Sequence, residues 1–355
     1  MHFKPAAWHI FLLSTLALLL PLANAEPRTV LPANFYLGDC ISQRIVFDKQ
    51  RLLELNGADS KRFKADRTKY DLTMDYGSID FVGTTAHFNL VKADRFETDI
   101  SMGARISTTR YMLHGKITAR MKPAVDPGVV STLITWSDFQ NEIPNSKEST
   151  QDEIDWEVVG KHPEHPEYNV FTGKSSNMER GAHGGAVSGT ITVNEFHDFT
   201  IDWRSDRIEW GVDGNVMKTL IKTQSFAALP GSLKPGEFWY PETPSRVQVS
   251  VWDGSMGDQR RWAGGPIPWG NRQKITVPYE WIEIQCYDDK DRPVTRWAAD
   301  GSGPTAENST TQSRFSRFAS KANSQTAALT KSNFYSICWI MSLAIIIPAL
   351  SIFHL

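Results

Sequence analysis

Between residues 36 and 298 the chain is a series of short apolar runs, and this pattern constrains its fold more than any other feature. The runs are rich in Val, Ile, Thr, Phe and Trp, are separated by Gly, Pro, Asn and Asp, and show no long helical period. Examples are Ser78–Val82, Lys116–Met121, Val130–Trp136, Phe199–Trp203 and Arg207–Val212. Asp213-Gly214 then supplies a hairpin-turn signal. The sequence therefore predicts an all-β fold, an antiparallel β-sandwich of about 250 residues.

The segment Asp-Glu-Ile-Asp-Trp-Glu, residues 152–157, gathers carboxylates on one face of a predicted strand. Side chains alternate along a strand, so Glu153, Asp155 and Glu157 share one face, and the apolar residues between them share the other. The mutual repulsion of these carboxylates destabilises the strand, so their presence favours a functional role. Cleavage of a glycosidic bond uses one carboxylate to attack the anomeric carbon and another to protonate the departing oxygen. The alternative is a charged strand face exposed to solvent.

The spacing of the two glutamates is wide for this chemistry. Residues four apart on a regular strand have Cα atoms roughly 13 Å apart, whereas a retaining glycosidase needs its carboxyl groups about 5–5.5 Å apart. We therefore expect a strand bent toward the substrate, with Glu153 and Glu157 leaning together. Asp155 would lie between them, hydrogen-bond the nucleophile and tune the proton affinity of the pair.

The two ends of the chain carry processing signals. Residues 1–25 combine Lys4, the apolar run Ile10–Leu20 and the small-residue site Ala23-Asn24-Ala25, which predicts a secretory signal peptide. We assign residues 26–298 to the β-sandwich domain and residues 299–335, rich in Ser, Thr and Asn, to a disordered stalk.

Residues 336–355 contain no charged side chain and follow a polar, small-residue stretch. This order predicts a signal for a GPI lipid anchor at the membrane, whose hydrophobic tail is removed. Candidate attachment residues are Ser320, Asn323 and Ser324. The alternative is a membrane span, which the length allows but for which no positive cluster follows.

The cysteines fit a secreted protein. Cys338 lies in the predicted tail, which leaves Cys40 and Cys286. An oxidising compartment favours a disulfide between them, and two buried free thiols are the alternative. The sequon at Asn308 is a predicted glycosylation site.

Composition indicates few other partners. The formal net charge of −2 does not indicate binding to nucleic acid, and no motif points to a nucleotide or redox cofactor. His162 and His165 have a spacing that metal ligands use, but Pro163 and Pro166 break any helix that would align them. We therefore predict a solvated loop, no metal site and no cofactor. The 12 Trp residues could fill a core or stack on sugar rings.

The acidic segment resembles the E-x-D-x-E signature of glycoside hydrolase family sixteen, and its surroundings resemble the Crh group of that family in particular. The segments that resemble family sixteen in general are Ser107–Lys116, Gly128–Val130, Phe196–Trp203 and Ile208–Gly214. The segments that resemble the Crh group in particular are Thr243–Val247, Trp252–Gly254 and Trp262–Gly265, and all of them occur in the same order as in that group. Crh proteins are fungal cell-wall transglycosylases that join chitin to β-glucan. The resemblance extends over about residues 70 to 275.

This resemblance implies a concanavalin-like jelly roll with a concave carbohydrate-binding cleft. We predict a monomer at the cell wall. The resemblance implies that Glu153 is the nucleophile, Glu157 the general acid/base and Asp155 their assistant. Chitin would be the donor and β-glucan the acceptor. The resemblance also suggests side chains that line the sugar subsites: Trp252, Trp262, Trp239, Tyr240, Trp136, Asn169 and Phe171. Burial in the core is the alternative for each aromatic ring.

Other functions remain open at this point. The same residues would serve an endo-β-glucanase that mainly hydrolyses, because hydrolysis and transfer differ only in the last step. A wall protein that binds sugar without catalysis is an alternative of another class, although it would not need every one of these carboxylates.

Overall fold

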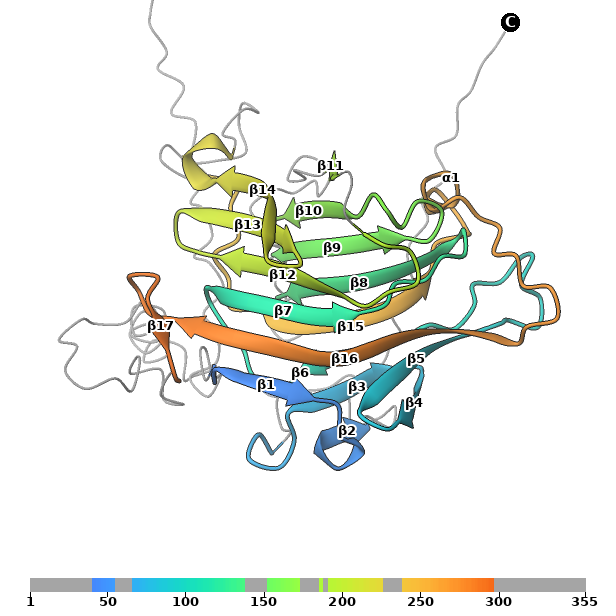
Figure 1. Cartoon of the computed structure of the whole chain (residues 1–355), viewed down its shortest axis with the longest axis horizontal. Coiled ribbons are helices and arrows are strands. Elements are labelled where there is room, and N and C mark those ends of the chain that lie inside the picture. The colour runs from blue at the N-terminus through green and yellow to red at the C-terminus, as the bar shows by residue number, and fades with distance from the viewer. Residues whose placement is uncertain are drawn as a thin grey trace, which may run out of the picture.

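The computed structural model describes residues 40–54, 66–137, 152–172, 185–187, 191–225 and 238–296. The predicted signal peptide, stalk, tail and sequon lie outside these residues. Two large sheets lie face to face in this part of the chain (Figure 1). Their strands pair antiparallel except for one parallel pair, β2 with β3. The predicted all-β sandwich is therefore confirmed.

One sheet has nine strands, and the other has eight and includes the strand that carries the acidic segment. The strands of the nine-stranded sheet are β14 (Asn215–Ile221), β13 (Arg207–Val212), β12 (His197–Trp203), β7 (Gly115–Met121), β16 (Lys274–Tyr287), β5 (Thr85–Val91) and β4 (Ser78–Val82), with β1 (Gln43–Val46) and β17 (Pro293–Val294) also paired to β16. The eight-stranded sheet has the order β11 (Gly185–Ala186), β10 (Glu167–Phe171), β9 (Glu153–Val159), β8 (Val129–Trp136), β15 (Arg246–Asp253), β6 (Ala104–Thr108), β3 (Leu72–Tyr76) and β2 (Leu52–Glu54). The short helices are η1 (Lys49–Arg51), η6 (Lys222–Gln224) and α1 (Gln259–Ala263).

Sequence pattern and strand positions agree closely. The run Ser78–Val82 is β4, and the other predicted runs fall within β7, β8, β12 and β13. Asp213 and Gly214 adopt positive φ angles of 49° and 80° at the turn between β13 and β14. Such angles match the right-handed twist of hairpin strands, which is why an Asp-Gly pair is favoured there.

The core between the sheets is rich in aromatic side chains. Trp156, Trp203 and Trp210 are each 0% exposed, and burial of one large apolar side chain contributes about 1.5–3 kcal/mol. Tyr279 of β16 reaches across to the other sheet, where its hydroxyl lies 3.0 Å from the carbonyl oxygen of Thr132 and 2.9 Å from that of Ser250. This phenol ties β8 and β15 to the nine-stranded sheet.

Cys40 and Cys286 form a disulfide, with their Cα atoms 6.0 Å apart. The bond joins the chain just before β1 to the end of β16, across 246 residues of sequence. The predicted pairing is confirmed.

His197 forms an ionic contact at the start of β12. Its Nδ1 lies 2.6 Å from Oδ2 of Asp213 and its Nε2 lies 3.0 Å from the carbonyl oxygen of Thr192. Since both partners accept, a ring protonated at both nitrogens satisfies both bonds. Burial lowers the pKa of His197, but the bonds to Asp213 and Thr192 outweigh it, and the pKa is raised above its usual value.

A pH-dependent stability follows from His197. The folded pKa exceeds the unfolded one, so the contribution is complete below pH of about 6.5 and is lost as pH rises through the folded pKa. We expect Asp213→Asn to cost roughly 1 kcal/mol at pH 5.5 and clearly less at pH 8.5 in urea unfolding. Asn tolerates the positive φ of this position. An equal loss at both pH values would contradict the ionic contact.

Candidate active site

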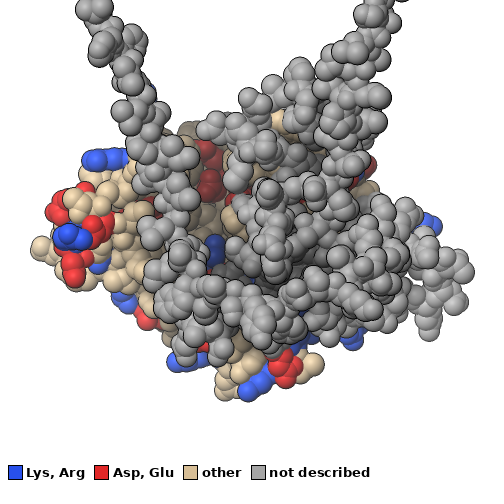
Figure 2. Space-filling view, turned by 180° about the vertical axis from the view of Figure 1, so that it is seen from behind, with Lys and Arg blue, Asp and Glu red and all other residues tan. Residues whose placement is uncertain are grey.

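Strand β9 presents its carboxylates on the outer face of the eight-stranded sheet. Ile154, Trp156 and Val158 are each 0% exposed and pack in the core. The alternate residues Glu153 and Glu157 are half-buried, and Asp155 is 1% exposed. The alternation predicted from the sequence is present. In the space-filling view from behind, one group of acidic side chains is visible near the upper edge, and other acidic side chains are scattered among basic ones (Figure 2).

The strand register brings other predicted residues beside these carboxylates. Residues that pair directly across antiparallel strands share a face. The rows across β10, β9 and β8 are Phe171–Glu153–Trp136, Asn169–Asp155–Ile134 and Glu167–Glu157–Thr132. Trp136, Asn169 and Phe171 therefore lie on the same face of the sheet as the carboxylates, and their role in sugar binding stays a prediction.

Indole hydrogen bonds fix the backbone of β9 from the opposite sheet. Nε1 of Trp156 donates to the carbonyl oxygen of Thr200 in β12, at 2.9 Å. In return, Nε1 of Trp210 in β13 donates to the carbonyl oxygen of Asp155, also at 2.9 Å. This role of Trp210 cannot be predicted from the sequence, because its position in an apolar run is equally typical of a plain core residue. Together these bonds hold the carboxylate-bearing strand against the core.

The carboxylates strongly affect one another's protonation. Burial raises the pKa of Asp155 well above its usual range, and the neighbouring Glu157 and Glu153 raise it further, against a hydrogen bond from the main chain of Asn169. Burial, and then the charge of Glu167, raise the pKa of Glu157 to about 7. Glu157 is therefore largely protonated below neutral pH, the state that a general acid requires.

Asp152 secures the start of β9, a role that the sequence analysis did not assign. The residue is 3% exposed. Its Oδ2 accepts hydrogen bonds from the backbone N–H groups of Glu242 and Thr243, at 2.8 and 2.9 Å. Its own N–H donates to Oγ of Ser137 at 2.6 Å. The first residue of the acidic segment thus connects β9 to the chain that leads into β15.

Asp152→Ala is expected to lower the free energy of unfolding by about 2–4 kcal/mol, because it leaves partly buried N–H groups without their charged acceptor. Urea unfolding measures the loss, with Asp258→Ala as a control, since the exposed Asp258 makes no side-chain cap to α1. Asp152→Asn keeps one acceptor oxygen and should lose less. Equal values for Asp152→Ala and the control would refute the assignment.

Trp252 and Trp262 form a stacked pair near Glu157. Their ring centroids are 5.8 Å apart with an interplanar angle of 21°. Both are half-buried and pack against Val130, Val159 and Ala263. Trp252 pairs with Val130, two residues along β8 from the Thr132 that faces Glu157. Aromatic rings are thus present at both ends of the carboxylate row, with Trp136 and Phe171 at the Glu153 end.

The predictions for Trp239 and Tyr240 need correction. Trp239 is 3% exposed and Tyr240 is 0% exposed, so both rings lie in the interior rather than on a sugar-binding surface. The Tyr240 hydroxyl donates to the carbonyl oxygen of Arg204 at 2.5 Å, in the turn between β12 and β13. A buried phenol with a satisfied hydroxyl supports the fold, and composition alone could not separate that role from sugar stacking.

A buried ionic cluster lies farther along the same sheet. Arg246, 1% exposed, donates from Nη1 to the carbonyl oxygen of Thr108 at 3.2 Å. Its Nη2 is 3.7 Å from Asp75, which also accepts from Nε of Arg105 at 3.1 Å. These residues belong to β15, β3 and β6, so Arg246 lies two strands from β9 and Arg105 three strands from β9 in the sheet order.

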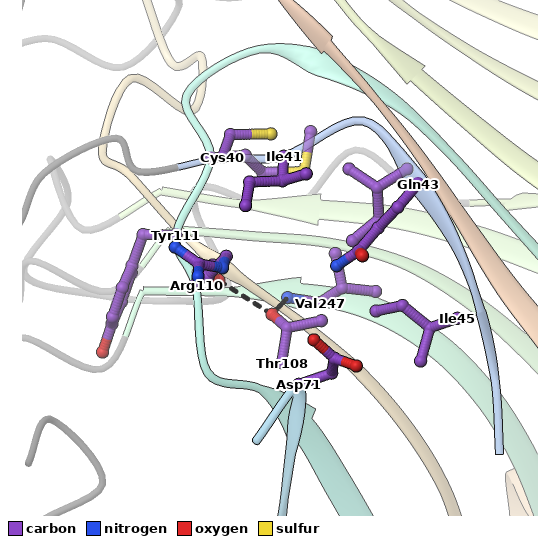
Figure 3. Close-up of a pocket in the computed structure, with 11 residues that line it drawn as sticks. Cys40, Ile41, Gln43, Ile45, Asp71, Thr108, Arg110, Tyr111 and Val247 are labelled. Carbon is purple, nitrogen blue, oxygen red and sulfur yellow. Dashed lines mark hydrogen bonds between the residues drawn. The ribbon is translucent and has the colours of Figure 1, made fainter. Parts of the chain in front are cut away.

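A small cavity between the sheets is unsuited to a sugar. It measures about 10 Å³ and is lined by residues that include Cys40, Ile45, Thr108 and Val247 (Figure 3). A void of that size holds at most one water molecule. It lies near the disulfide, and its lining includes none of the carboxylates of β9.

Within the described ranges, no group of three or more His, Cys, Asp and Glu side chains is arranged to hold a metal ion. The helices of the same ranges lack the length and apolarity needed to cross a membrane.

Two antiparallel sheets with a carboxylate row on the outer face of one of them define a carbohydrate-active β-sandwich. The chain belongs to the glycosyl hydrolases family 16, whose model matches residues 56–282. The family resemblance predicted from the acidic segment and its flanks is confirmed.

Crh-like proteins are among the curated relatives of the chain. Over 197 residues the chain is 33% identical to Crh-like protein 2 of Aspergillus fumigatus, covering 53% of this chain and 41% of that protein. It is 30% identical to Congo red hypersensitive protein 2 of Saccharomyces cerevisiae, covering 53% and 38%. The chain thus spans less than half the length of these curated relatives. The solved structure of the apo Crh5 transglycosylase shares the fold, with a TM-score of 0.52 and 23% identity over 75% of this chain and 92% of that one.

Proposed function

We propose that the chain is a retaining cell-wall glycosidase that works as a transglycosylase, cleaving chitin and joining it to β-glucan. The observation that carries the proposal is the row of Glu153, Asp155 and Glu157 on one face of β9, with the pKa of Glu157 raised to about 7. One face then holds an acid that is protonated at mildly acidic pH. Membership of family 16 and similarity to Crh-like proteins support the same reaction class.

In the first step, Glu153 attacks the anomeric carbon of the donor and the glycosidic bond breaks. The leaving oxygen takes the proton of Glu157, and a covalent glycosyl-enzyme remains. In the second step, ionised Glu157 accepts a proton from an incoming hydroxyl, whose oxygen attacks the same carbon and releases Glu153. Two displacements at one carbon retain its configuration. Asp155, buried between them, limits the charge of the row because its own raised pKa favours the protonated form.

Transfer and hydrolysis differ in what enters for the second step. A sugar hydroxyl competes with water at high concentration, so an acceptor must be held in line with the intermediate. The stacked rings of Trp252 and Trp262 lie next to the row of Glu157 and offer apolar faces for a sugar. We propose that this pair holds the acceptor.

Trp252→Ala is therefore expected to lower the ratio of transfer to hydrolysis by roughly tenfold, the effect of losing about 1–2 kcal/mol of acceptor binding. The measurement is the proportion of transfer and hydrolysis products at a fixed acceptor concentration. Trp281→Ala, on the other sheet, is the matched control. An unchanged ratio in the Trp252 variant would assign the pair to structure alone.

The experiment that tests the function uses the full-length chain with chitin oligosaccharides and fluorescently labelled β-glucan oligosaccharides. Labelled products that gain mass by chitin units, absent with Glu153→Gln, would support a chitin–glucan transglycosylase. Shortened chains without transfer would indicate an endo-β-glucanase. No change with any donor would overturn catalysis and favour a sugar-binding wall protein.

We also propose the cellular setting. The signal peptide, the GPI anchor and the glycan at Asn308 rest on sequence patterns outside the described residues. They would place a monomeric enzyme at the plasma membrane and cell wall, beside its polysaccharide substrates.

A further inference from the structure

A fourth carboxylate, which the sequence analysis did not select, lies directly opposite Glu157. Glu167 of β10 pairs with Glu157 of β9 in the antiparallel register. Directly opposed residues share a face, with Cβ atoms about 4.5–5.5 Å apart. Like charges at this spacing destabilise a sheet, so the arrangement needs a reason.

Glu167 is held by the indole of Trp262. Nε1 of Trp262 lies 2.9 Å from both Oε1 and Oε2 of Glu167. An indole N–H can only donate, so the carboxyl oxygens of Glu167 are the acceptors in this contact. Trp262 is itself fixed by stacking on Trp252 and by packing on Val130 and Val159. The carboxylate of Glu167 therefore has a defined position beside Glu157.

The charged groups around Glu157 come from several elements. On β9 these are Asp155 and Glu153, and on β10 Glu167. The facing positions on β8 and β15 hold no titratable side chain: they are Thr132, Ile134, Ser250 and Gln248. The nearby turn and α1 carry Lys161, His162, Glu164, His165, Arg260 and Arg261. Burial raises the pKa of Glu157 most, and the neighbouring charge of Glu167 raises it further.

We propose that Glu167, held by Trp262, is a positioning residue that keeps Glu157 protonated until the donor is cleaved. This inference rests on the proposed function of Glu157 as general acid/base. The same charge serves both steps: it favours a proton on Glu157 for the leaving oxygen, and it then makes ionised Glu157 a stronger base toward the acceptor hydroxyl.

The test is the pH dependence of kcat/KM for the wild type and Glu167→Gln. Gln keeps the shape and can still accept the Trp262 bond, but it carries no charge. In Glu167→Gln, we expect the basic limb of the kcat/KM profile to shift to lower pH by about one unit. Activity should then fall about fivefold at pH 7 and stay nearly unchanged at pH 5. Glu167→Asp keeps the charge and should restore most of the wild-type profile.

Two comparisons sharpen the result. Glu164→Gln removes the same charge from the adjacent turn and should leave the limb in place. Trp262→Phe keeps a ring but loses the N–H, so it should move the limb in the same direction as Glu167→Gln. A basic limb that is unchanged in Glu167→Gln would overturn the inference, whatever the total loss of activity.

A second readout does not need turnover. The ¹³C carboxyl resonance of Glu157, assigned by its absence in Glu157→Gln, can be followed by NMR through a pH titration. A lower midpoint in Glu167→Gln supports the inference, and an unchanged midpoint overturns it. An inactive wild type with a shifted midpoint would refute the proposed function but leave the electrostatic coupling established, so the two failures are distinguishable.

Discussion

Replacing Glu153 with Gln is expected to lower kcat/KM for glycan cleavage by roughly four to six orders of magnitude. The amide has nearly the shape of the carboxylate but cannot form the glycosyl-enzyme, so the covalent route is lost. Steady-state kinetics with labelled oligosaccharides measures the loss. Thermal unfolding should show little change, because Glu153 lies half-buried on the outer face of the sheet and not in the core.

A chemical rescue identifies the role of Glu153 more directly. In Glu153→Ala, azide can occupy the space of the lost carboxylate and attack the anomeric carbon once, which gives a glycosyl azide of inverted configuration. Glu283→Gln, a half-exposed carboxylate on β16 that pairs with Arg44, is the matched control and should keep full activity. Activity of Glu153→Gln within tenfold of wild type would exclude it as the nucleophile.

Glu157→Gln is expected to abolish cleavage of unactivated substrates and, at the same time, to stabilise the folded chain above neutral pH. The pKa of Glu157 rises from an ordinary 4.5 to about 7. The folded state therefore binds this proton more tightly than the unfolded state does. Wild-type stability should fall as pH rises from about 4.5 to about 7, and the variant should lack that part of the fall.

The free energy of unfolding of Glu157→Gln is expected to exceed that of the wild type by about 2–3 kcal/mol at pH 8 and by close to zero at pH 4. Urea unfolding at several pH values measures it. The charge of Glu157 also raises the pKa of Asp155. Its removal therefore makes ionised Asp155 less unfavourable in the folded state, which increases the stability of the variant in the same direction. A variant less stable than wild type at pH 8 would show that the carboxylate contributes packing or bonds that outweigh its charge.

These predictions describe a site that costs stability and is held by the rest of the fold. Ionising carboxylates close together in a poorly solvated row is unfavourable. The hydrogen bonds of Trp156 and Trp210, and the backbone contacts of Asp152, keep β9 in place against that repulsion. The loss of stability at high pH is thus a consequence of the same crowding that supplies an acid near neutral pH.

Local pattern was enough for much of the molecule. Period-two alternation placed Ile154, Trp156 and Val158 in the core and Glu153, Asp155 and Glu157 outside, because strand geometry permits only that division. The turn at Asp213-Gly214 followed from the φ angles that those residues tolerate. Counting the cysteines outside the predicted tail left Cys40 and Cys286 as the two candidates, and the structure shows that they form a disulfide rather than remain free thiols.

Other features depend on contacts between distant segments. In the sequence, nothing distinguishes Glu167 from an ordinary surface acid. Its role depends on the strand register, which places it opposite Glu157, and on the hydrogen bond from the indole of Trp262, 95 residues away in sequence. Trp239 and Tyr240 resembled Trp252 and Trp262 as aromatic candidates, yet packing buried the first two and left the second two half-exposed. Composition and spacing cannot distinguish them, since any large aromatic ring suits either place.

The sequence by itself determined the all-β class, the faces of the strands, the two cysteines available to pair and the carboxylates of β9, because each depends on local geometry or on counting. Only the tertiary structure decided which charges face Glu157, which tryptophans remain available to a sugar and which indoles hold β9. These depend on strand order and register, and a shift of one residue in register would turn every side chain to the opposite face.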